Sequence, residues 1–196
     1  MNFADLYRFA NEESDGRNVG FRSLADCVID RHPRIGGVET WRVNLDPTIS
    51  IGYMLYEEER TSPYEPPFDV AVIRFHDALN RCWSRFVCCK ELMHVFDGHN
   101  ARTDTAAKFA ILLAELESTP LLRDASDMFR AENDAIWMAM LVMCPERIRK
   151  VLIKSDNHSD EELMTIAQTI KLPVQVVRAI SKPYYFAALE TLTGDI

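Results

Sequence analysis

One short stretch of the chain combines residue types that can hold a metal ion or activate a water molecule. Lys90-Glu91-Leu92-Met93-His94 places a carboxylate and an imidazole three residues apart, which puts both on one face of a helix. In zinc peptidases with the motif His-Glu-x-x-His, two imidazoles bind the metal and the Glu activates the bound water. Lys90 occupies the position of the first His. Because Glu-x-x-His recurs by chance in many helices, other parts of the chain have to decide its meaning.

Two further motifs give this stretch a context. Arg85-Phe86 ends four residues before position 90, and the segment from Glu132 to Pro145 has the pattern Glu-x-x-Ala-x-x-Met-Ala-x-x-Val-Met-Cys-Pro. Together with a short helical tail, these motifs resemble the ImmA/IrrE family of metallopeptidases. In that family Arg-Phe precedes His-Glu-x-x-His, and a Glu that opens a later helix is the third zinc ligand. The resemblance covers roughly residues 70–180.

The resemblance implies a role for three residues. His94 matches the second His ligand, Glu132 matches the Glu ligand, and Glu91 matches the general base. It also implies a zincin-like fold. Active members of the family cut regulatory proteins, often helix-turn-helix repressors, and are common in bacterial mobile elements. A protein partner or a protein substrate is therefore expected, and a helix-turn-helix regulator is one candidate.

Lys90 departs from the family pattern, and two hypotheses about the site follow from it. A protonated ammonium has no lone pair for zinc and repels the ion, and two remaining ligands are fewer than the usual three plus water. In the first hypothesis the site is a relic, with the Lys90 ammonium in the place of the metal and paired with Glu91 or Glu132. The protein then binds no cofactor and acts through protein binding.

The second hypothesis keeps a metal-dependent peptidase with a changed ligand set. His94 and Glu132 would hold zinc, Asp97 or His99 would complete the set from the end of the helix, and Glu91 would act as the general base. Further candidate ligands are His76 and Asp77. A third reading is a structural or antitoxin-like protein, in which His94 is a hydrogen-bonded core residue and the charged groups form a structural cluster.

Composition narrows the possible fold and partners. The chain has 196 residues, 47% of them apolar, and a net charge of −8, which fits one folded domain and argues against a nucleic-acid partner.

The five cysteines include no Cys-x-x-Cys pair, so buried thiols in a reducing cytoplasm are expected. The adjacent Cys88 and Cys89 are expected to fill the core. The start of the chain lacks the features of a signal peptide. The longest apolar run, Ala135–Cys144, has half the length of a bilayer span of roughly 20 residues, so no membrane is expected.

Apolar periodicity predicts an α+β domain, with a small N-terminal sheet packed on a mainly helical C-terminal two-thirds. We divide it into N-terminal helices and sheet (1–80), motif-bearing helices (81–153) and a helical tail (154–196). The expected helices begin near Phe3, Phe21, Arg81, Thr103 or Asp104, Asp124 or Ser126, Arg147, Ser159 and Pro173. Two strands joined by a turn at Asp46-Pro47 and a third strand at Phe68–Ile73 are expected, with a loop over residues 57–67. The tail resembles a helix-turn-helix motif. Only Gln175 and Arg178 on its expected exposed face could contact DNA bases, so a packing role is expected.

Overall fold

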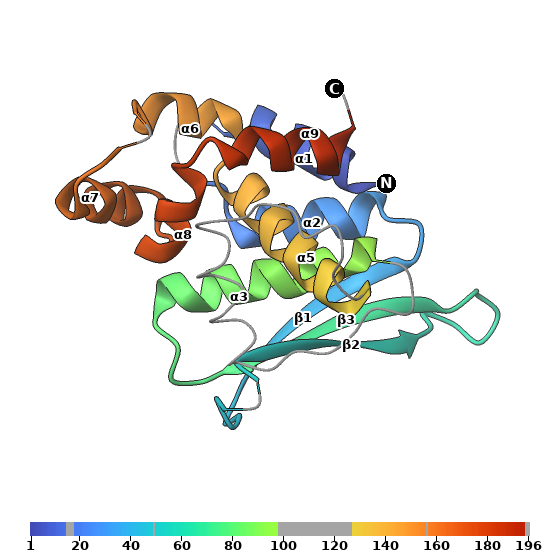
Figure 1. Cartoon of the computed structure of the whole chain (residues 1–196). Helices are drawn as coiled ribbons and strands as arrows, with labels where there is room; N and C mark the ends of the chain where they lie inside the picture. The colour runs from blue at the N-terminus through green and yellow to red at the C-terminus, as the bar shows by residue number, and fades with distance from the viewer. Residues whose placement is uncertain (15–17, 49, 98–126, 156, 195–196) are drawn as a thin grey trace.

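The computed structural model describes residues 1–14, 18–48, 50–97, 127–155 and 157–194. It has a three-stranded sheet, and the described helices lie on one side of that sheet (Figure 1). The predicted α+β class with a small N-terminal sheet and mostly helical remainder is confirmed. The helix predicted after Thr103 or Asp104 and the candidate ligand His99 lie outside the described residues.

The sheet has an order that the sequence did not indicate. Strands β1 (Ile35–Val43), β2 (Gly52–Glu59) and β3 (Phe68–His76) are arranged as β1-β3-β2. β3 is parallel to β1 and antiparallel to β2, so β1 and β2 are not neighbours although they follow one another in the chain. Four successive residues of β3, Val70 to Ile73, are buried. The most continuously apolar strand therefore takes the central position, where it has a neighbour on each side.

β2 is also longer than predicted. It continues through Glu57, Glu58 and Glu59, which the charge pattern assigned to a loop. These glutamates are exposed, and an edge strand tolerates charged side chains because one of its sides faces solvent.

Two N-terminal helices follow the predicted periodicity. α1 (Phe3–Glu13) buries Phe3, Leu6, Tyr7 and Ala10, and α2 (Phe21–Arg31) ends before His32-Pro33. The side chain of Asn2 accepts a hydrogen bond from the Asp5 amide in a capping box that begins α1. α2 contacts β1, and both helices contribute to the core.

The motif-bearing helices pack on each other and on the sheet. α3 (Arg81–Met93) contacts β2, β3 and α5 (Asp127–Met143). A 3-10 turn, η1 (His94–Phe96), follows α3 directly, so the predicted helical stretch tightens in its last turn. α5 buries the whole apolar run that the sequence assigned to a core helix and ends before Pro145. Two positions that the resemblance links, 90 and 132, thus lie on two helices in contact.

A short helix α6 (Glu146–Leu152) follows α5, and the tail consists of α7 (Asp160–Ile170), α8 (Val174–Ile180) and α9 (Tyr184–Thr193). Ser159 caps α7 as predicted, and the Glu162 side chain accepts a hydrogen bond from the Ser159 amide. α9 was not predicted, although Pro183 precedes its first residue, a position that favours helix starts. Among the described residues, no helix has the length and apolar character needed to cross a bilayer.

Candidate functional site

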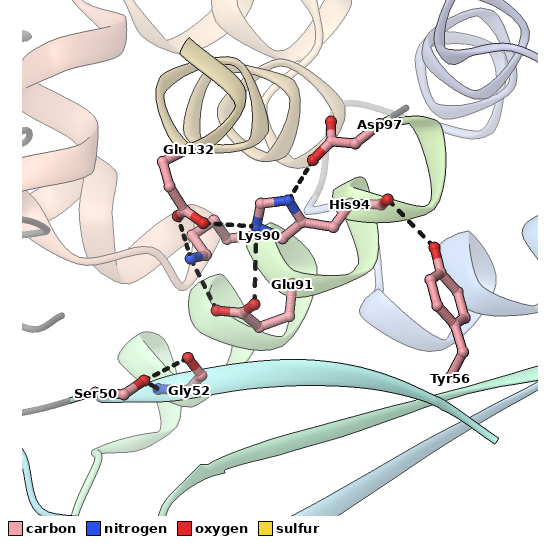
Figure 2. Close-up of polar contacts among 8 residues, drawn as sticks. All are labelled: Ser50, Gly52, Tyr56, Lys90, Glu91, His94, Asp97 and Glu132. Atoms are coloured by element: carbon pink, nitrogen blue, oxygen red, sulfur yellow. Dashed lines mark hydrogen bonds and ion pairs between the residues drawn. The ribbon is translucent and has the colours of Figure 1, made fainter. Parts of the chain in front are cut away.

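The ammonium of Lys90 lies between two carboxylates in the interior of the protein (Figure 2). Its Nζ atom is 2.9 Å from Glu91 Oε1 and 2.8 Å from Glu132 Oε2. The exposed fraction of the Lys90 side chain is only 1%. The relic hypothesis paired this ammonium with Glu91 or Glu132, and the structure has it in contact with both. We call Lys90, Glu91, His94, Asp97 and Glu132 the Lys90 cluster.

His94 joins the two helices from the other side of the cluster. Its Nε2 atom is 3.3 Å from Glu132 Oε1 and 3.8 Å from Glu91 Oε2. Its Nδ1 atom is 2.5 Å from Asp97 Oδ2. Glu132 therefore contacts both Lys90 and His94, one with each carboxylate oxygen.

Asp97 lies on the opposite side of the imidazole from Glu132 (Figure 2). A carboxylate at Nδ1 fixes the orientation of the ring and of the Nε2 atom. Asp97 is thus placed to orient His94, whereas a ligand to a shared metal would have to stand on the Nε2 side with Glu91 and Glu132. The backbone carbonyl of His94 also accepts a hydrogen bond from the Tyr56 hydroxyl at 3.3 Å.

The contacts within the cluster control the pKa values of His94 and Glu132. Burial alone lowers the pKa of His94, but the contacts with Asp97 and Glu132 outweigh it and raise that pKa to about 10. Burial alone raises the pKa of Glu132, but His94 and Lys90 outweigh it and lower that pKa to about 2. These contacts favour the imidazolium form of His94 and the carboxylate form of Glu132.

This arrangement does not fit a zinc ion. The Lys90 ammonium contacts both carboxylates that would face the metal. A dication at this place would have to displace that ammonium. What the cluster does chemically is neutralise buried carboxylates with side-chain cations.

His76 and Asp77 lie at the end of β3. His76 Nδ1 is 3.2 Å from Asp77 Oδ1, so these two candidate ligands contact each other. The Asp77 amide donates a hydrogen bond to the Val43 carbonyl of β1, which continues the β1–β3 pairing beyond the strand.

Gly52, at the start of β2, is a site residue that sequence reasoning missed. A Cβ at this position would lie 2.5 Å from Val87 Cγ1 and 3.5 Å from Glu91 Oε1, so the strand backbone packs directly against α3 beside Glu91. The Ser50 hydroxyl holds this strand start, accepting from the Gly52 amide at 3.1 Å and donating to its carbonyl at 2.7 Å (Figure 2). A glycine in an expected strand is the available signal, because it often marks close backbone approach.

Arg85 fastens the tail to the site helix. Its Nη1 atom donates to the carbonyls of Ile170 (3.2 Å) and Lys171 (2.6 Å) at the end of α7, and Nη2 donates to the Val19 carbonyl (2.9 Å). Lys171 has a left-handed backbone with φ of 57°. The Arg85 of the Arg-Phe motif therefore caps a second helix instead of facing the cluster.

The cysteines are unpaired as expected, and all but the half-buried Cys82 are buried. All five are free, and Cys88 and Cys89 are buried. Burial raises the pKa of Cys88 to about 12 and raises that of Cys89 further. Thiols in this state are poor nucleophiles at neutral pH.

Comparisons of the chain with protein-family models, curated proteins and solved structures found no match. The resemblance to ImmA/IrrE metallopeptidases rests on the residues of the motifs.

Proposed function

We propose that this chain is a non-catalytic, zincin-like relative of the ImmA/IrrE metallopeptidases that acts by binding a protein. The observation that carries the proposal is the position of the Lys90 ammonium, 2.8 Å from Glu132 and 2.9 Å from Glu91. These are the residues that the resemblance assigns to metal binding and to water activation. An internal cation at this position takes over the charge balance that a metal would supply.

Two further properties of the cluster support the loss of catalysis. A metal ligand must be deprotonated, and the raised pKa of His94 opposes that. A general base needs its proton donor within hydrogen-bond reach, whereas Glu91 has a side chain only 3% exposed and contacts the Lys90 ammonium.

The partner class follows from the resemblance and from charge. Active relatives act on regulatory proteins, so a protein partner, with a helix-turn-helix regulator of a bacterial mobile element as a candidate, is the proposed ligand. The net charge of −8 disfavours nucleic acid. The proposed setting is the cytoplasm.

Metal analysis tests the non-catalytic half of the proposal. Protein purified without added zinc, then soaked in zinc and desalted, should contain no stoichiometric metal. Lys90→His should acquire stoichiometric zinc that is lost in Lys90→His/His94→Ala. Stoichiometric zinc in the natural sequence that disappears in His94→Ala would overturn the proposal in favour of a peptidase with His94, Glu132 and Asp97 or His99 as ligands.

Cross-linking in cells tests the binding half. The tagged full-length chain and its Glu91→Gln variant are cross-linked, and captured proteins are identified by mass spectrometry. The proposal expects the same intact partner with both chains. A partner that is recovered intact only with Glu91→Gln, and as fragments with the natural sequence, would show that Glu91 still supports cleavage.

A further inference from the structure

A small cavity of about 90 Å³ lies beside the helical tail, at the start of α7 and the end of α8. It is lined by Asn157, His158, Leu163, Arg178, Ser181 and Lys182. These elements lie at one end of the helical part in Figure 1. The cavity has room for several water molecules. None of its lining residues belongs to the Lys90 cluster, so the cavity is a separate feature of the molecule.

Nitrogen-bearing side chains line the cavity. The His158 side chain is only 8% exposed, and its Nε2 atom is buried with no hydrogen-bond partner among the residues described. Lys182 makes no side-chain ion pair within the described part of the chain. A buried polar atom without a protein partner is uncommon in folded proteins. Arg178 adds a guanidinium at the same cavity.

The carboxylates near these donors are already engaged. Asp160 Oδ1 accepts from Arg178 Nη2 at 2.8 Å. Glu162 Oε2 accepts from the Ser159 amide at 2.8 Å and from its hydroxyl at 3.0 Å, and it lies 3.9 Å from His158 Nδ1. Both carboxylates already accept from other donors, and within the described part of the chain neither is paired with the Lys182 ammonium.

We propose that this cavity binds a tetrahedral oxyanion, namely a phosphate group. Phosphate oxygens accept charge-assisted hydrogen bonds from ammonium and guanidinium groups, and the group is small enough for a space of several waters. The phosphate would be free orthophosphate or the modified side chain of a phosphorylated protein. The inference is independent of the proposed function, because it uses none of the residues of the Lys90 cluster.

Nuclear magnetic resonance of the full-length, ¹⁵N-labelled chain tests the inference. Orthophosphate is added in one titration and N-acetyl-phosphoserine amide in another. In both, the chloride concentration is lowered in step so that the ionic strength stays constant. Saturable shifts are expected in the amides around Asn157–Leu163 and Arg178–Lys182, and in the His158 ring. Tighter binding of one probe identifies the source of the phosphate. The absence of saturable shifts with both probes overturns the proposal.

Matched variants separate this cavity from general surface charge. Lys182→Gln should weaken binding by about tenfold, the effect of losing one charge-assisted hydrogen bond, and His158→Gln should also weaken it. Lys154→Gln is the control, because Lys154 is exposed in the same tail and, among the described residues, donates to the Lys150 carbonyl alone. Equal binding by Lys182→Gln and the natural sequence, or an equal loss in Lys154→Gln, overturns the proposal. Unchanged amide spectra outside the tail check that each variant is folded.

Discussion

Lys90 Nζ and Glu132 Oε2 are 2.8 Å apart in a contact that joins the last turn of α3 to α5. The side chains are 1% and 9% exposed, so both charges have lost most of their water. A buried ion pair of this kind contributes little net stability compared with apolar residues. Removal of one partner is costly, however, because the other charge stays buried.

We expect Lys90→Met to lower the free energy of unfolding by about 3 kcal/mol, since Glu91 and Glu132 would lose their shared cation. Glu132→Gln should also destabilise the protein. The double variant Lys90→Met/Glu132→Gln should lose clearly less than the sum of the single losses, because the two residues interact. Urea unfolding followed by circular dichroism measures all three. Additive losses would contradict a direct Lys90–Glu132 interaction.

The sequence could anticipate part of this cluster. Spacing along one helix predicts that Glu91 and His94 share a face, and the family pattern links them to Glu132 on a later helix. The position of Asp97 could not be predicted in the same way. Asp97 follows the 3-10 turn, beyond the last helical residue, so helical spacing alone does not say at which ring nitrogen its carboxylate lies.

The fold, too, could be predicted from the sequence only in part. Local periodicity predicts each described strand and most helices, because alternation and apolar stripes are local properties. It does not predict that β3 inserts between β1 and β2. Pairing between strands distant in sequence depends on which strand buries the most apolar surface in the central position. The approach of Gly52 to Val87 is likewise a tertiary contact.

The raised pKa of His94 makes stability depend on pH. This pKa rises from 6.5 to about 10 on folding, so the imidazolium contributes stability fully below about pH 6.5 and loses it as the pH rises toward 10. The pKa of Glu132 falls from 4.5 to about 2, so its contribution is present above pH 4.5 and lost as the pH falls toward 2. Urea midpoints from pH 2 to 10 should therefore be highest between about pH 4.5 and 6.5.

Asp97→Asn tests whether the Asp97 carboxylate causes the raised pKa of His94. An amide at this position removes the carboxylate that raises the pKa of His94, so the pKa should fall and the alkaline loss of stability should begin at a lower pH. Ring resonances of His94 followed by nuclear magnetic resonance report the pKa directly. An unchanged His94 pKa in Asp97→Asn would contradict the assigned role of Asp97.

The close approach of β2 to α3 gives a steric prediction. In Gly52→Ala the new methyl would lie 2.5 Å from Val87 Cγ1, and overpacking of this kind costs about 1–3 kcal/mol of unfolding free energy. Val87→Ala alone leaves a cavity and is also destabilising. Gly52→Ala/Val87→Ala should be more stable than the sum of the two losses predicts, because the removed methyl groups make room for the added one. Thermal unfolding of the three variants measures this, and strictly additive losses would place the strand farther from α3.

The capping of α7 by Arg85 predicts a local effect at a distance from the cluster. Arg85→Gln removes donors from the carbonyls of Ile170, Lys171 and Val19 and should lower stability by about 1–3 kcal/mol. Amide hydrogen exchange should accelerate most in α7. Arg8→Gln is the matched control, because within the described part of the chain the one ion pair of Arg8 is its exposed pair with Asp5, which contributes little. Faster exchange spread evenly over α3 and α7 would show that Arg85 supports the whole core instead of fastening the tail.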